Sequence, residues 1–144
     1  MKPLIMALML MGPFSMAEPC DCWPDKRSVA DEFKAADAVF VGTLHTRIMY
    51  DESVLPDKRG VEQIVFEVEA GFKNVTSAAV LMFNRSNSTC SLIFEPGATY
   101  LIYAFKTTKG ELHTHTCSRT VQIDAAMDDL EALGEPEYLK EELR

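Results

Sequence analysis

The chain has 144 residues and a formal net charge of −8, with 22 acidic against 14 basic side chains. Affinity for a nucleic-acid backbone comes mostly from Lys and Arg, so this balance argues against a nucleic-acid partner. The length and the hydrophobic fraction of 47% are those of one globular domain with a core of its own.

Residues 1–17 have the layout of a secretory signal peptide. Lys2 precedes an apolar run over 3–14, and Ser15 and Ala17 are small residues in the positions before a cleavage site. A run of about a dozen residues is too short to cross ~30 Å of hydrocarbon as a helix. We therefore expect cleavage after Ala17, a secreted or periplasmic product, and no membrane partner after cleavage.

The cysteines Cys20, Cys22, Cys90 and Cys117 are even in number, which in an exported chain predicts disulfide bonds. A bond between Cys20 and Cys22 would close a very small, strained ring. Two pairings remain, in which Cys20 and Cys22 each bond to Cys90 or Cys117. In both pairings the N-terminal segment is joined to distant parts of the chain.

A metal site is the alternative use of these cysteines. His113, His115 and Cys117 alternate, so a strand would place all three on one face. Together with Cys20 and Cys22 they resemble a soft Cys/His site for zinc or copper. The competing interpretation is two ordinary strand histidines beside a disulfide-bonded cysteine, and the even cysteine count favours it.

Hydrophobic periodicity predicts a mainly β domain over 18–123 with a short helix at 26–36, for which Ser28 is a suitable N-cap. A charged tip at 51–60 separates the first two strands, and Lys109-Gly110 is a tight turn between the last two. Strands are expected at residues 37–50, 61–72, 78–83, 99–108 and 111–120. Five strands in a small chain predict a closed or partly closed barrel.

The C-terminal segment 124–144 is predicted to be an acidic helical tail that packs on the barrel or flanks it. A helix is expected to end at Gly134, and a second short helix has Pro136 in its first turn. The acidic runs at 124–131 and 135–142 are interpreted as solvated helix faces.

No catalytic motif is visible, so we expect neither an enzyme nor a bound cofactor. Three glycosylation sequons begin at Asn74, Asn84 and Asn87.

Several segments in this order resemble one family, the N-terminal domain of the tissue inhibitors of metalloproteinases, within the netrin-like modules. The resemblance runs from Cys20 to about Thr120. Its segments are Cys20-x-Cys22, "ADAVFVGTL", "FEVEAGFKN", "NSTC" and "YLIYAFKTTKGELHTHTC". It implies a five-stranded OB-type barrel and the disulfides Cys20–Cys90 and Cys22–Cys117.

The resemblance also implies inhibition of a zinc metalloprotease by the α-amine and carbonyl of Cys20, which would chelate the catalytic zinc. The side chain of Asp21 would enter the pocket beside that metal. Implied protease contacts are Cys20, Asp21, Cys22, Ser88, Thr89, Cys90 and Ser91.

The chain departs from the family in three ways. Glu18 and Pro19 precede Cys20, so cleavage after Ala17 leaves no free amine on Cys20. Asp21 stands where the family has a small hydroxyl residue. The family's remaining N-domain disulfide and its C-terminal domain have no counterpart. The alternative function is therefore a non-inhibitory extracellular or periplasmic binding module, with the tip 51–60 or the acidic tail as its contact surface.

Overall fold

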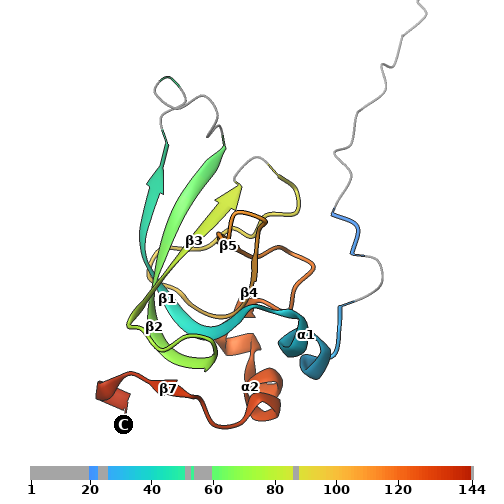
Figure 1. Cartoon of the computed structure of the whole chain (residues 1–144), viewed down its shortest axis with the longest axis vertical. Helices are drawn as coiled ribbons and strands as arrows, with labels where there is room; N and C mark the ends of the chain where they lie inside the picture. The colour runs from blue at the N-terminus through green and yellow to red at the C-terminus, as the bar shows by residue number, and fades with distance from the viewer. Residues whose placement is uncertain (1–19, 23–25, 51–52, 54–59, 86–87, 144) are drawn as a thin grey trace, which may run out of the picture.

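The computed structural model describes residues 20–22, 26–50, 53, 60–85 and 88–143. It is a mainly β structure in which five antiparallel strands form a nearly closed barrel, and this confirms the predicted fold class. The strands pair in the order β3-β2-β1-β4-β5, and β3 comes close to β5 at the remaining gap (Figure 1). The main strands are β1 (Ala38–Met49), β2 (Val61–Lys73), β3 (Ala79–Arg85), β4 (Thr99–Lys106) and β5 (Leu112–His113).

The barrel interior is filled by aromatic and aliphatic side chains. Alternate residues of β2 point inward, as the two-residue period of a strand requires. Phe66 contacts Phe40, Phe94 and Tyr100 edge-to-face, with ring centroids 5.1 to 6.4 Å apart. Register shifts between β1 and β2 bend both strands around this core.

The first half of β1 is buried on both faces, which explains its continuous apolar run. Phe40 points into the barrel, whereas Val39 and Val41 belong to a second cluster outside it. The second cluster is covered by Phe33 of helix α1 (Val29–Ala35) and by Leu130 of helix α2 (Met127–Leu133). The two helices lie together below the barrel (Figure 1).

Helix α1 begins and ends as its sequence and its surroundings require. The Ser28 hydroxyl accepts a hydrogen bond from the Asp31 N–H at 3.2 Å, so the predicted N-cap is confirmed. At the other end, the Lys73 ammonium of β2 donates to the carbonyl oxygens of Phe33 and Ala36 at 2.7 and 2.6 Å. A cation at a helix C-terminus stabilises the unpaired carbonyls there.

The predicted strand over 111–120 is wrong beyond its first residues. β5 stops at His113, and the chain then turns. The Ser118 hydroxyl donates to the His115 carbonyl at 2.8 Å and stabilises this turn. The buried Thr114 hydroxyl donates to the Tyr103 carbonyl of β4 at 2.8 Å, which holds the turn against the sheet. After this turn a short strand, β6 (Val121–Gln122), pairs with β4 and leads into the 3₁₀ turn η2 (Ile123–Ala125).

The predicted second helix over 135–144 is also wrong. This segment contains a short strand, β7 (Tyr138–Leu139), which pairs with β2, followed by the 3₁₀ turn η3 (Glu141–Leu143). Tyr138 packs against the barrel core, and the Lys140 ammonium lies 2.7 Å from a Glu67 carboxylate oxygen of β2. Partners on β2, distant in sequence, therefore decide the conformation of the tail.

Candidate functional site

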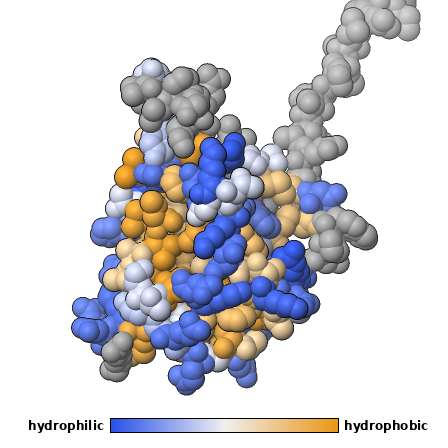
Figure 2. Space-filling view, viewed as in Figure 1, coloured by the Kyte–Doolittle hydropathy of each residue, from blue (hydrophilic) through white to orange (hydrophobic). Residues whose placement is uncertain are grey.

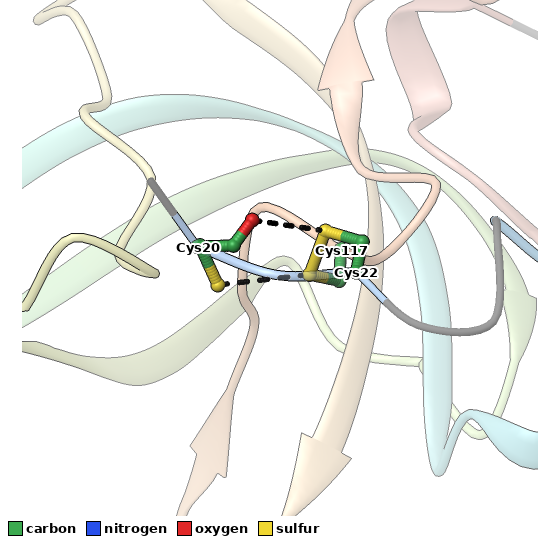
Figure 3. Close-up of side chains that lie close together, drawn as sticks. All are labelled: Cys20, Cys22 and Cys117. Atoms are coloured by element: carbon green, nitrogen blue, oxygen red, sulfur yellow. Dashed lines mark hydrogen bonds between the residues drawn. A yellow bond between two sulfur atoms is a disulfide. The ribbon is translucent and has the colours of Figure 1, made fainter. Parts of the chain in front are cut away.

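Two disulfide bonds attach the N-terminal segment to the barrel. Cys20 is bonded to Cys90 and Cys22 to Cys117, with Cα atoms 5.0 and 5.2 Å apart. These distances lie in the usual range for a disulfide. The pairing is the one that the family resemblance implies, and it places residues 20–22 between the loop after β3 and the turn after β5 (Figure 3).

The sulfur atoms of this segment lie close together but do not form a metal site. The Cys20 Sγ is 3.7 Å from the Cys117 Sγ, and the Cys22 Sγ is 3.9 Å from the Cys20 carbonyl oxygen (Figure 3). Disulfide sulfur carries no proton, so both are packing contacts. No described cysteine is free, which leaves His113 and His115 as the remaining ligands of the predicted site. Zinc sites in proteins normally use three or four protein ligands.

The Cys20–Cys90 bond brings the sequence-predicted contact residues together. Asp21, Ser88 and Thr89 are exposed, while Cys90 and Ser91 are half-buried. The loop has internal hydrogen bonds from the Cys90 N–H to the Ser88 hydroxyl and from the Ser91 N–H to the Ser88 carbonyl, both at 3.2 Å. The adjacent turn is joined to it by the Thr116 N–H, which donates to the Cys90 carbonyl at 2.9 Å.

Ile93 lies in the same loop, two residues after Ser91, and sequence reasoning missed it. Its side chain is 87% exposed, although Leu92 packs against the core and Phe94 is 1% exposed. The Arg47 guanidinium donates to the Phe94 carbonyl, which fixes the loop from β1. An exposed isoleucine between two packed residues is the available signal, but their burial is known only from the fold. We call residues 20–22 and 88–93 the contact edge.

His113 and His115 lie beside the contact edge with Phe105. The His115 ring stacks on Phe105 with centroids 5.4 Å apart, and the two imidazole centroids are 6.3 Å apart. Burial lowers the pKa of His113, against a smaller effect of the Asp37 charge. Burial, with the nearby His113, also lowers the pKa of His115. Both imidazoles are therefore neutral at pH 7.

A cavity of about 380 Å³ opens between β3 and β5, where the barrel does not close. Its lining includes Ser88, Cys90 and Ser91 of the contact edge, together with both histidines. Its charged lining residues are Arg85, Lys109 and Glu111.

A buried charged network lies at the C-terminal end of the turn after β5, around Arg119. The Arg119 guanidinium donates to both carboxylate oxygens of Asp129, and the Tyr103 hydroxyl donates to the same carboxylate at 2.9 Å. The backbone N–H of Arg119 donates to the buried Glu32 carboxylate at 3.2 Å. The interpretation of 124–131 as a solvated face is therefore wrong at Asp129, which is 6% exposed.

The remaining predicted surface features have mixed outcomes. Asn84 is buried and donates to Glu62 and to the Leu92 carbonyl, so its amide is not accessible for glycosylation in the folded protein. Asn74 is exposed. Asn87, the predicted signal peptide 1–17, Glu18, Pro19 and most of the tip 51–60 lie outside the described residues.

The exposed surface is mixed in polarity, with hydrophobic residues gathered over part of the sheet and bordered by hydrophilic ones (Figure 2). In the described part of the chain, no helix is long and apolar enough to cross a membrane. The disulfides favour an oxidising compartment.

No family model and no curated protein matches this chain.

Proposed function

We propose that this protein is an exported binding domain that inhibits a zinc metalloprotease through its contact edge. The observation that carries this proposal is the Cys20–Cys90 disulfide, which joins the two halves of the edge into one exposed surface. A surface already ordered before binding loses little conformational entropy when it meets a rigid protease cleft. The resemblance to metalloproteinase inhibitors supplies the class of partner.

The chemistry of zinc binding rests on the backbone of Cys20. A free α-amine and the adjacent carbonyl oxygen form a five-membered chelate with a metal ion and would displace its catalytic water. Among the described residues, the Cys20 carbonyl oxygen accepts no N–H or O–H hydrogen bond. In a chain that begins at Glu18, the Cys20 nitrogen is an amide, which is a poor metal ligand.

The test is an inhibition panel of zinc metalloendopeptidases with two forms of the oxidised protein. One form begins at Glu18, and the other is released from a fusion so that it begins at Cys20. We expect the Cys20 form to inhibit and the Glu18 form to inhibit much more weakly. Carbamylation of the Cys20 amine is the matched control and should abolish inhibition. If neither form inhibits any member of the panel, the protease proposal is rejected.

A second candidate function is binding without inhibition, and Glu18-Pro19 favours it. These two residues block the amine when the leader is removed after Ala17. The contact edge would then bind a protein partner through its side chains, and no metal would take part.

Ile93 is expected to contribute to binding in both cases. Replacement of Ile93 by Ser should weaken complex formation by about tenfold or more, because burial of an isoleucine side chain contributes roughly 1.5–3 kcal/mol. The free energy of unfolding should hardly change, since the side chain is 87% exposed in the free protein. Titration calorimetry with a metalloprotease identified in the panel measures the first effect, and urea unfolding measures the second.

The matched control is Met127→Ser, which removes another exposed apolar side chain, 68% exposed, at the start of α2. Equal losses of affinity for the two variants would contradict the assignment of Ile93 to the binding surface.

A further inference from the structure

The cavity between β3 and β5 is a site that neither the contact edge nor the core explains. β3 contributes Phe83, Asn84 and Arg85 to one wall. The turn from Thr107 to Glu111, with the two histidines after it, contributes the other wall. A volume of about 380 Å³ is within the range of small-molecule sites, which starts at roughly 300 Å³.

The basic side chains of this cavity are not neutralised within the described part of the chain. The described part of the chain contains four arginines. Three of them, Arg27, Arg47 and Arg119, pair with carboxylates. Arg85 has no such partner, and neither has Lys109. In a protein of net charge −8, two cations that line one cavity and have no carboxylate partner among the described residues favour an anionic ligand.

The polar groups around these cations present hydrogen-bond donors. The Thr107 hydroxyl oxygen accepts from the N–H groups of Lys109 and Glu111 at 3.2 and 3.3 Å, which leaves its proton for another acceptor. The Ser88 hydroxyl oxygen likewise accepts from the Cys90 N–H. Each neutral histidine adds one ring N–H. An acceptor-rich oxyanion such as phosphate or sulfate matches this set, because its oxygens act mainly as hydrogen-bond acceptors.

We propose that this cavity binds a small organic molecule bearing a phosphate or sulfate group, with Arg85 and Lys109 as the charged contacts. The cavity is larger than a single oxyanion needs, so the rest of the ligand would occupy the apolar part beside Phe83. This proposal does not depend on protease inhibition, although both sites share Ser88, Cys90 and Ser91.

Affinity for sulfate, whose own charge is constant near neutral pH, should increase as the pH falls below the ordinary histidine pKa of about 6.5, because His113 and His115, whose pKa values burial lowers, gain positive charge there. The groups that face them include Asp37 near His113, and Glu32 and Arg27 near His115. Glu111 in the wall opposes the anion, whereas Arg85 and Lys109 attract it.

The experiment follows the imidazole C–H signals of the oxidised full-length protein by NMR during titration with inorganic phosphate and inorganic sulfate. Glucose 6-phosphate, glucose 6-sulfate and glucose then distinguish the two anion chemistries and the contribution of the organic part. We expect saturable shifts of His113 and His115. His45, exposed on β1 and not part of this cavity, is the internal reference and should not shift.

Arg85→Gln and Lys109→Gln should each weaken binding by about tenfold, the effect of losing one charged hydrogen bond. Lys34→Gln removes one exposed positive charge on α1 and should leave the affinity unchanged. The melting temperature of each variant shows that it is folded. Shifts that do not saturate, shifts of equal size at His45, or equal affinities of the Arg85 and Lys34 variants would each overturn the proposal.

Discussion

Replacement of Cys22 and Cys117 together by serine is expected to lower the free energy of unfolding by about 4 kcal/mol. The bond closes a loop with a sequence separation of 95 residues, and a cross-link of this span restricts the unfolded chain strongly. For a domain of this size the melting temperature should fall by on the order of 15 °C. Equilibrium unfolding in guanidinium chloride, compared with the unmodified protein, measures the change.

Replacement of Cys20 and Cys90 is the matched comparison. Its sequence separation of 70 residues gives a chain-entropy effect within about 0.3 kcal/mol of the other bond. The two double variants should therefore be destabilised similarly, but only loss of the Cys20–Cys90 bond should release residue 20 from the 88–93 loop. A loss below about 1 kcal/mol in both variants would contradict the entropic account.

Asp129→Asn is expected to destabilise the protein by about 2–3 kcal/mol. The substitution keeps the shape of the side chain but removes the charge that binds Arg119, and a buried ion pair that loses one partner costs roughly this much or more. The expected loss lies at or below the lower end of the roughly 3–5 kcal/mol typical of a broken buried pair, because the Arg119 side chain is 26% exposed. Urea unfolding at pH 7 measures the loss.

Asp128→Asn is the control, since Asp128 is the exposed neighbour on the same helix. Equal destabilisation by the two substitutions would contradict a role for the buried network.

The same pair gives a pH dependence whose sign is set by Asp129. Burial alone would raise the pKa of this carboxyl, but hydrogen bonds from Arg119 and Tyr103 outweigh it and lower the pKa. The unfolded chain therefore binds its proton more readily than the folded chain. This contribution is complete above the ordinary Asp pKa of about 3.9 and is lost as the pH falls through the lower folded value. Asp129→Asn should lack this part of the acid-induced loss of stability.

The contact edge and the cavity are neighbours that share some residues. Each also has residues that the other lacks, so the two proposals can be tested separately. Cys90 belongs to both, and its disulfide fixes one wall of the cavity as well as one half of the edge. Ile93→Ser should affect protein binding without moving the histidine signals, because Ile93 is not part of the cavity lining. Arg85→Gln should have the converse effect.

The amino-acid sequence by itself determined the barrel strands β1 to β4, because their signals are local. The alternation in β2 and the apolar run of β1 reflect which face of each strand is buried. The Ser28 cap and the Lys109-Gly110 turn are also set by neighbouring residues, and Gly110 has the positive φ of 80° that such a turn uses. The residues alone left two disulfide pairings open, and only the family resemblance selected between them.

Tertiary contacts decided the features with no local signal. The segment after Gly134 reads as an acidic helix, yet pairing with β2 makes Tyr138–Leu139 a strand. Asp129 has the sequence pattern of an exposed helical residue, but Arg119 and Tyr103 surround it. The cavity exists because β5 is too short to close the barrel against β3, and the exposure of Ile93 follows from the packing of its two neighbours. In each case the deciding factor is a residue distant along the chain or the packing of a whole loop. A pattern in neighbouring residues therefore does not predict the feature.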